Sequence, residues 1–208
     1  MTGLSQTFAD THSGTIGKGL VASGWTAVHT PDYSSTTRNG FSNTSYWTLP
    51  TSPSGATTFL IARVGDVAEG IKQTITNLTS GTGYEIEVSY LYPIAQGGYS
   101  TWFTGSPSTQ LAYVDIGGTK TPLPTGSGNV WYTTTVKFTA TSSSVTLELG
   151  MEIGGNDYAT AFDVGPNAVK LPVDLIAFTA EQLGNKNALL HWTTASEINN
   201  SHFDIERS

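Results

Sequence analysis

The sequence contains no cysteine and few charged side chains, and each shortage removes a class of protein from consideration. Without cysteine there is no disulfide framework, no thiol catalysis and no thiolate metal site. Charged residues make up 12% of the chain, too few for long helices with many ion pairs, so we expect little helix. The Lys and Arg residues form no local cluster and leave a net charge of -7, which predicts that nucleic acid is not a partner.

The sequence also lacks a signal peptide and any apolar run long enough to cross a membrane. We therefore predict no membrane insertion. The chain is either cytosolic or a secreted protein in which Met1 and Thr2 stand in place of a leader, and we favour the secreted alternative. The expected location is extracellular or at the cell surface.

The motifs of common catalytic machineries are missing as well. There is no G-x-S-x-G elbow and no phosphate-binding loop. The pairs Glu85/Glu87 and Glu148/Glu152 lie at alternate positions of strand candidates, which places both pairs on solvent faces away from aromatic loops. The histidines are scattered, and none joins a recognisable zinc or Ser-His-Asp constellation. We therefore expect the protein to have no enzymatic activity.

What the sequence does contain is a strong strand signal between Tyr84 and Tyr92. Apolar residues occupy every second position there, with two glutamates and a serine between them, which predicts a half-buried antiparallel strand. Ile71 and Ile75 alternate with polar residues just before it. The Ser-Gly-Thr-Gly at 80–83 tolerates positive φ, so we expect the two runs to pair as neighbours in one sheet.

Further strand candidates recur between Gly- and Pro-rich turns. They cover residues 3–8, 59–64, 111–116, 131–140, 145–151 and 162–164. Strands at this spacing predict an all-β chain whose main part, residues 1–170, is a two-sheet antiparallel β-sandwich of jelly-roll type.

The composition shifts at Lys170-Leu171-Pro172, and residues 171–208 offer strand candidates at 174–180, 187–193 and 202–207. Three strands are too few to close a sandwich. We therefore predict a second β domain cut off at its third strand, with an open edge through which the chain could self-associate with another copy.

The tail LPVDLIAFTAEQLGNKNALLHWTTASEINNSHFDIERS carries a specific resemblance. Its LPV-L-FTA, L-W-TASE-NN and F-IERS elements resemble the fibronectin type III-like segment near the C-termini of secreted proteins of Bacteroidetes. The resemblance covers about a fifth of the chain. It implies that residues 171–208 begin a fibronectin type III-like domain and that the protein is exported to the surface.

The first 170 residues resemble a galactose-binding-like jelly roll. The residues that carry the resemblance are Gly24-Trp25-Thr26, Thr30–Tyr33, Gly70–Ile75, Leu78–Gly81, Trp131 with Phe138–Ala140, and Phe162–Val164. Such domains occur as carbohydrate-binding modules of families 4 and 9. The resemblance implies a non-catalytic module for polysaccharide or oligosaccharide. The alternative is an adhesin or structural surface domain that binds protein or no ligand, because one architecture hosts several functions.

The same resemblance implies a structural Ca²⁺ ion. In such modules calcium often lies between an acidic residue after the first strand and an aspartate of the last strand. Asp10 and Asp163 occupy comparable places here, and carboxylate oxygens are suitable calcium ligands. Where the family closes with two aspartates, this chain has Asp163 followed by Val164.

Aromatic residues in polar loops are the candidates for sugar binding, because a pyranose stacks its apolar face on an aromatic ring. Trp102, with Tyr99 and Phe103, lies among glycines and serines and has no periodic reason to be there. The alternative is that Trp102 folds back as a lid on the core.

Trp47 and Tyr46 form the second candidate group, with Arg38 as a possible hydrogen-bond donor to the ligand. Packing under a long loop is the alternative for these two rings. We assign Trp25 and Trp131 to the core, since both stand at strand starts.

Overall fold

The computed structural model describes residues 8–41, 47–65, 67–95, 103–105, 107, 109–154, 158–166, 168–170, 175–183 and 187–194, with only the backbone at residues 170, 175, 176 and 183. Within these ranges every regular element is a strand. Among the described residues there is likewise no helix that is long and apolar enough to cross a membrane.

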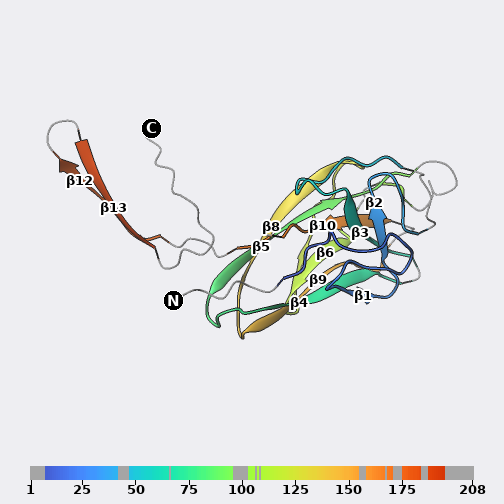
Figure 1. Cartoon of the computed structure of the whole chain (residues 1–208), viewed down its shortest axis with the longest axis horizontal. Helices are drawn as coiled ribbons and strands as arrows, with labels where there is room; N and C mark the ends of the chain where they lie inside the picture. The colour runs from blue at the N-terminus through green and yellow to red at the C-terminus, as the bar shows by residue number, and fades with distance from the viewer. Residues whose placement is uncertain are drawn as a thin grey trace.

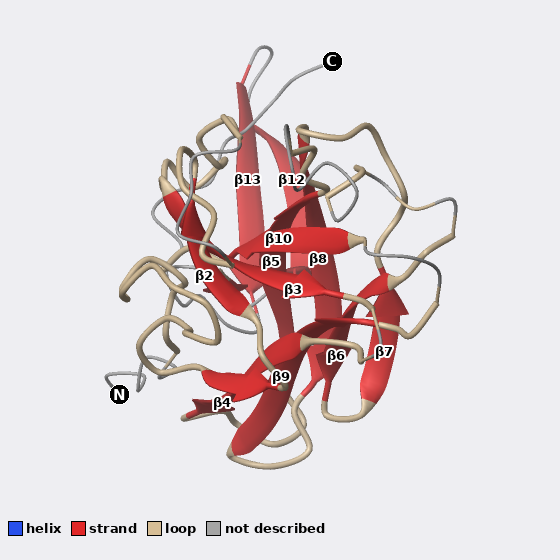
Figure 2. Ribbon diagram, turned by 90° about the vertical axis from the view of Figure 1, so that its right-hand side faces the viewer, coloured by secondary structure: helices blue, strands red, loops and turns tan. Residues whose placement is uncertain are grey.

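The strands form two packed antiparallel sheets, which confirms the predicted all-β sandwich (Figures 1 and 2). Sheet A has the order β1 (Thr26–Val28), β4 (Gly70–Thr76), β9 (Ser144–Met151), β6 (Ala112–Ile116), β7 (Thr119–Pro122). Sheet B has the order β11 (Val169–Lys170), β5 (Gly83–Leu91), β10 (Ala159–Asp163), β3 (Thr58–Arg63), β2 (Asp32–Ser35), with β8 (Trp131–Thr139) also paired to β5.

Strand β5 is the centre of sheet B, as its alternating pattern predicts. It pairs with β8 along its whole length on one edge and with β10 and β11 on the other. The expectation that the preceding run pairs with it is wrong, because β4 lies in sheet A and pairs with β1 and β9. Asn77 and Gly81 adopt positive φ in the connection, which carries the chain from one sheet across to the other.

The core lies between the facing sides of the two sheets. Ile71 and Ile75 of β4 meet Ile86 and Val88 of β5 there, all of them fully buried. Trp25 is 6% exposed and belongs to this core, so its sequence assignment is confirmed. Burial of alternating positions on both sheets is what fixes the register of each strand, since a slip of one residue would expose the apolar set.

A second apolar cluster covers part of the opposite, outer face of sheet B. Its buried members are Trp47, Leu49, Phe59, Ile61, Leu91, Ala95, Phe103, Ala159 and Ala161. Trp131 packs against this cluster and is only partly buried, which corrects its assignment to the core between the sheets. Loop residues therefore close over the outer face where the strands β3, β5 and β10 present small or apolar side chains.

Strands β12 (Leu175–Leu183) and β13 (Asn187–Thr194) form a two-stranded sheet of their own. Phe178 stands opposite Trp192, and these side chains are 56% and 39% exposed. Trp192 is therefore not a core residue, contrary to what its apolar neighbours suggest, because two strands alone cannot cover a ring. The third strand candidate, 202–207, lies outside the described residues, and the boundary at residue 170 and pairing with another copy stay predictions.

Replacing Phe59 with Ala tests whether the outer-face cluster is part of the folded core. Phe59 is fully buried, so we expect the Phe59→Ala variant to lose about 3–5 kcal/mol of unfolding free energy in chemical denaturation. Phe178→Ala is the matched control, because that ring is 56% exposed and its loss should change stability by less than about 0.5 kcal/mol. Equal stabilities for the two variants would contradict the packing of this cluster.

Candidate functional site

The aromatic side chains predicted to bind sugar are placed in the outer-face cluster wherever the structure describes them. Trp47 is 4% exposed and Phe103 is 1% exposed. Their ring centroids lie 5.1 Å apart at an interplanar angle of 77°, and Trp47 Nε1 donates to the carbonyl of Ser35 at 3.0 Å. Neither ring offers a free face for stacking, which corrects the expectation for these two residues.

The reason is that Trp47 and Phe103 lie in irregular segments, where no periodic pattern shows whether a side chain is buried. Trp47 and Phe103 pack onto Phe59 and Ile61 of β3 and Leu91 of β5 on the outer face of sheet B. Arg38 is exposed and its backbone closes a turn with Ser35, so its contact with a ligand stays a prediction. Tyr46, Tyr99 and Trp102 lie outside the described residues, and their role likewise stays a prediction.

Beyond this cluster the same outer face becomes polar. Trp131 of β8 stands opposite Leu91 of β5, and two residues further along β8 Thr133 stands opposite Ser89. Ser89 in turn faces Asp163 of β10, and its hydroxyl lies 3.1 Å from that of Thr133. The strands thus present an aromatic ring at the edge of the apolar cluster, followed by hydroxyls and carboxylates.

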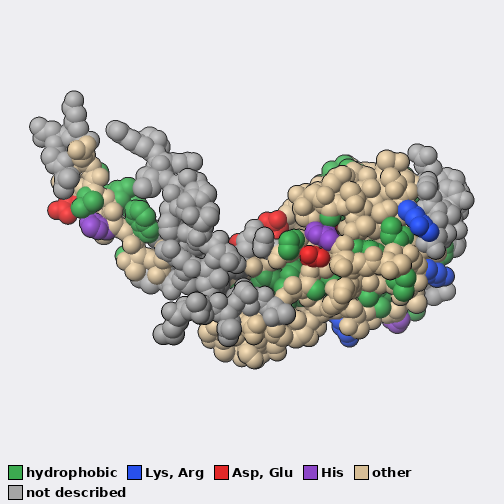
Figure 3. Space-filling model, in the orientation of Figure 1, with side chains coloured by type: hydrophobic (Ala, Val, Ile, Leu, Met, Phe, Trp, Pro, Cys, Tyr) green, Lys and Arg blue, Asp and Glu red, His purple; other side chains and the backbone are tan. Residues whose placement is uncertain are grey.

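A recess of about 300 Å³ opens on this polar part of the face. Its walls include Ser54 and Pro53 from a turn, Glu87 and Ser89 from β5, and Asp163 from the end of β10. In the view of Figure 3 charged side chains are sparse on the surface of the sandwich. The recess offers hydroxyl and carboxylate groups, which are the partners of polyhydroxylated ligands.

Trp131 is held at the edge of the cluster by two contacts. Its Nε1 donates to the carbonyl of Pro50 at 2.8 Å, and its ring meets Phe59 edge-on at 5.5 Å between centroids. Part of the side chain stays accessible to solvent. A ring fixed in this way loses little conformational entropy when it contacts a ligand.

Ser54 reaches the recess because the sequence Ser52-Pro53-Ser54-Gly55 forms a tight turn. The N–H of Gly55 donates to the carbonyl of Ser52 at 2.9 Å, and serine at the first, proline at the second and glycine at the fourth position are typical of a type I turn. This turn signature is the sequence signal that could have identified Ser54.

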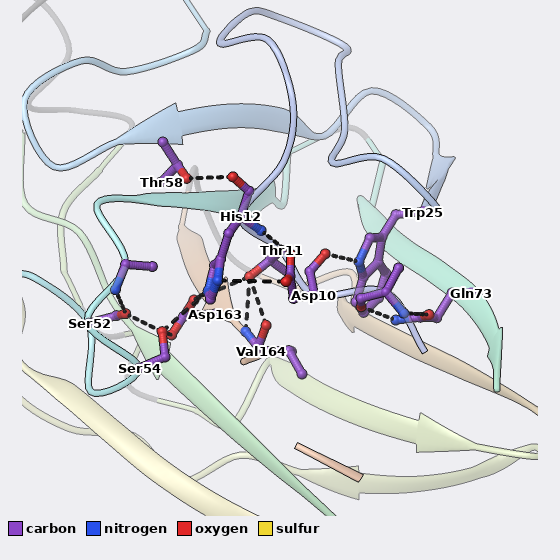
Figure 4. A network of polar contacts seen from close by, with 12 residues as sticks. Asp10, Thr11, His12, Trp25, Ser52, Ser54, Thr58, Gln73, Asp163 and Val164 are labelled. Atoms are coloured by element: carbon purple, nitrogen blue, oxygen red, sulfur yellow. Dashed lines mark hydrogen bonds and ion pairs between the residues drawn. The ribbon is translucent and has the colours of Figure 1, made fainter. Parts of the chain in front are cut away.

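The carboxylate of Asp163 is the centre of the polar network in Figure 4. The side chain is 1% exposed. Its Oδ1 accepts hydrogen bonds from His12 Nε2 at 2.7 Å and from Thr11 Oγ1 at 3.2 Å, and its Oδ2 accepts one from Ser54 Oγ at 2.6 Å. Every donor comes from a segment far from β10 in the sequence, and only the approach of the segment around Asp10 to Asp163 was expected.

Serine, histidine and aspartate meet here, but their wiring differs from that of a hydrolase triad. The Ser54 hydroxyl donates to Asp163, and His12 Nε2 also points at Asp163, at 2.7 Å, while it lies 3.2 Å from Ser54 Oγ. A carboxylate only accepts, so Nε2 carries a proton and cannot take one from Ser54. The arrangement therefore holds Ser54 in place and does not activate it as a nucleophile.

The surroundings of Asp163 do not fit the calcium ion that the jelly-roll resemblance implies. Calcium needs six or more oxygen ligands, whereas both oxygens of Asp163 already accept protein hydrogen bonds and one of the three donors is an imidazole nitrogen. Asp10 is occupied by the backbone N–H of His12 at 2.9 Å. Among the described residues, no three His, Asp or Glu side chains are grouped so that they could hold a metal ion.

Two buried carboxyl groups lie at the other end of this face. Burial raises the pKa of Asp32 to about 6, against the opposing effects of the Gly19 N–H and the Arg63 and Lys18 charges. Burial also raises the pKa of Glu69 to about 7, although it accepts hydrogen bonds from the Arg63 N–H and the Thr30 hydroxyl. Asp32 Oδ2 has no hydrogen-bond partner among the described residues, which agrees with a carboxyl group that favours its neutral form.

No known family model matches the chain, and no curated protein matches it. Several solved structures share a similar arrangement of strands. The enzymatically active domain of tailspike protein 4 from bacteriophage CBA120 has a TM-score of 0.45 and 11% identity over 72% of this chain and 20% of its own length. The chain therefore spans only about a fifth of that structure.

Two carbohydrate-binding modules are similar over most of their length. TmCBM61, solved in complex with β-1,4-galactotriose, has a TM-score of 0.38 and 9% identity over 72% of this chain and 88% of its own. The CBM22-1 xylan-binding domain of Paenibacillus barcinonensis Xyn10C has a TM-score of 0.40 and 14% identity over 77% of this chain and 96% of its own. Similarity at this level concerns the arrangement of the strands and does not identify a ligand of this chain.

The raised pKa values of Asp32 and Glu69 predict a stability that falls as the pH rises. Each folded-state pKa lies above its ordinary value, 3.8 for Asp32 and 4.5 for Glu69, so each contribution is complete below that value and is lost through about pH 6 to 7. The loss is roughly 3 kcal/mol per carboxyl group. Chemical denaturation at a series of pH values measures it.

Asp32→Asn and Glu69→Gln provide the controls for this prediction, because an amide has a similar shape and does not titrate. We expect each variant to show a flatter dependence of unfolding free energy on pH than the wild type. A wild-type stability that increases between about pH 5 and about pH 8, or identical curves for all three proteins, would contradict the assignment.

Proposed function

We propose that the sandwich is a non-catalytic carbohydrate-binding module that holds an oligosaccharide or polysaccharide on the outer face of sheet B. The observation that carries this proposal is the fixed, partly exposed ring of Trp131 in line with the recess formed by Ser54, Glu87 and Ser89. In this proposal the ring of Trp131 contacts the apolar face of a sugar, and the recess receives hydroxyl groups of the same or the next unit.

The chemistry of the recess supports a polyhydroxylated ligand. Glu87 is exposed and carries a carboxylate, a group of the kind that accepts hydrogen bonds from sugar hydroxyls. The hydroxyls of Ser54 and Ser89 can take either role. Asp163 serves a different purpose, because its oxygens are already occupied and it instead orients Ser54 at the edge of the recess.

A binding role is preferred to catalysis because of how these groups are connected. Glycoside hydrolysis needs one carboxyl group that protonates the leaving oxygen and a second that attacks or activates water. Asp163 is 1% exposed and accepts protein hydrogen bonds on both oxygens, so it is not available for either role. Ser54 is likewise not activated.

We also propose that the module belongs to a secreted or cell-surface protein, in which it holds the remainder of that protein against a glycan. This part of the proposal is supported by the resemblance of residues 171–208 to the fibronectin type III-like segment of Bacteroidetes proteins. The burial of Trp47 and Phe103 favours the second candidate function, an adhesin or structural surface domain, because it removes two predicted stacking rings.

Substitutions at Trp131 and Glu87 test the proposed face. We expect Trp131→Ala and Glu87→Gln each to weaken glycan binding about tenfold or more, since each removes a contact worth roughly 1.5 kcal/mol or more. Affinity electrophoresis against a panel of plant and algal polysaccharides identifies a ligand, and calorimetry with its oligosaccharides measures the change.

Trp192→Ala and Glu181→Gln are the matched controls, because both positions lie on the exposed hairpin β12–β13 and outside the recess. Circular dichroism verifies that each variant is folded. Equal losses in control and test variants would reject the proposed face, and failure of folded wild-type protein to bind any glycan in a broad panel would favour the adhesin or structural alternative.

The acidic character of the recess predicts a preference for uncharged glycans. Glu87 and Asp163 line it, and the whole chain carries a net charge of -7, so a polyuronate would be repelled. We expect binding to a neutral polysaccharide to depend little on salt, and binding to polyuronates to be absent at low ionic strength. Tight, salt-sensitive binding of a polyuronate would place the site elsewhere on the molecule.

A further inference from the structure

The segment before the first strand of the sandwich is joined to both sheets by hydrogen bonds. On the side of sheet A, the Ala9 N–H donates to Gln73 Oε1 at 2.9 Å, and Gln73 Nε2 donates to the Ala9 carbonyl at 2.8 Å. On the side of sheet B, the Thr11 N–H donates to the Val164 carbonyl at 3.1 Å, and the Val164 N–H donates to Thr11 Oγ1 at 3.0 Å. Residues 9–12 therefore bridge the two layers, from β4 in sheet A to the end of β10 in sheet B.

This bridge runs directly over a buried negative charge. Asp163 is 1% exposed, and a carboxylate at such a position is costly unless donors satisfy its oxygens. In related architectures a cation can meet this demand, and Asp10 and Asp163 are the residues that the resemblance assigns to it.

In this chain the imidazole of His12 occupies the position between Asp10 and Asp163. Nε2 lies 2.7 Å from Asp163 Oδ1, and Nδ1 lies 4.0 Å from Asp10 Oδ2, so the ring stands between the two carboxylates. Thr11 and Ser54 complete the donors around Asp163, and Ser52 fixes Ser54 through a contact of 2.9 Å between hydroxyls. Because Ser54 gives its proton to Asp163, Ser52 is the donor in that contact. Figure 4 shows these side chains converging from separate segments on one carboxylate.

We propose that His12 replaces the structural cation that the resemblance implies, so that the bridge between residues 9–12 and strand β10 forms and holds without metal. The inference is independent of the proposed function, because it concerns how the sandwich is closed and not what its outer face binds. It assigns His12 as a positioning residue that satisfies Asp163 and, through Asp163, orders Ser54.

The first test measures the melting temperature of the wild-type protein after treatment with EDTA and again with millimolar CaCl₂. We expect no difference between the two, and no binding heat when CaCl₂ is titrated into EDTA-treated protein. Extracellular calcium sites bind in roughly the submillimolar to millimolar range, so a working site would be filled under these conditions. A calcium-dependent rise in melting temperature or a saturable binding heat would overturn the proposal.

The second test removes the imidazole. His12→Ala leaves Asp163 buried without its shortest nitrogen donor, and we expect the melting temperature to fall by about 6 °C or more. His12→Gln, whose amide can still donate to a carboxylate, should recover part of the loss. His191→Ala is the matched control, since His191 is exposed on β13, and it should leave the melting temperature unchanged.

An NMR measurement distinguishes loss of the hydrogen bond between His12 and Asp163 from a general loss of packing. In histidine-¹⁵N-labelled protein treated with EDTA, the Nε2–H of His12 should give a slowly exchanging proton signal, because it donates to a buried carboxylate. The signal should persist when CaCl₂ is added and disappear in His12→Gln. An unchanged melting temperature in His12→Ala, or displacement of the signal by calcium, would reject the role of His12. If His12→Ala does not fold, the wild-type calcium measurements and the proton signal still decide.

Discussion

The structure depends on one buried carboxylate at the end of its central sheet. Asp163 terminates β10, is 1% exposed, and is satisfied by donors from Thr11, His12 and Ser54. Burying a charge away from water is tolerated only when such donors are present. The segments that supply the donors must therefore reach Asp163 in the folded chain. The bridge between the two sheets and the shape of the neighbouring recess therefore have the same physical cause.

The outer face of sheet B is divided by what its strands present. Over Phe59 and Ile61 of β3 and Leu91 of β5, apolar rings from the loops pack and the surface is closed. Where β5 and β10 present Ser89 and Asp163, polar side chains do not attract such cover, and a recess remains open. Trp131 lies at the border, and this position gives it both a fixed ring and an accessible part.

The sequence predicts the sandwich well because its evidence is periodic. Alternation between Tyr84 and Tyr92 identifies β5 and the side of it that faces the core, and the tertiary structure has no reason to override it. The pairing of β4 could not be read in the same way, since a turn that tolerates positive φ fits a hairpin and a crossing between sheets equally well. Most contacts of Asp163 could not be predicted from the sequence either, because their partners are distant along the chain. His12 lies 151 residues from Asp163, Ser54 lies 109 residues from it, and no local pattern links them.

The two ends of the outer face show different solutions to the burial of acidic groups. At one end Asp163 is surrounded by hydroxyl and imidazole donors, which satisfy both oxygens. At the other end burial raises the pKa values of Asp32 and Glu69 to about 6 and about 7, although Glu69 accepts a hydrogen bond on each oxygen. Donors that satisfy a carboxylate also fix the segments that carry them, as Thr11, His12 and Ser54 are fixed at Asp163. The donors at Asp163 hold Ser54 at the edge of the recess, whereas the raised pKa values of Asp32 and Glu69 make the opposite end of the face respond to pH.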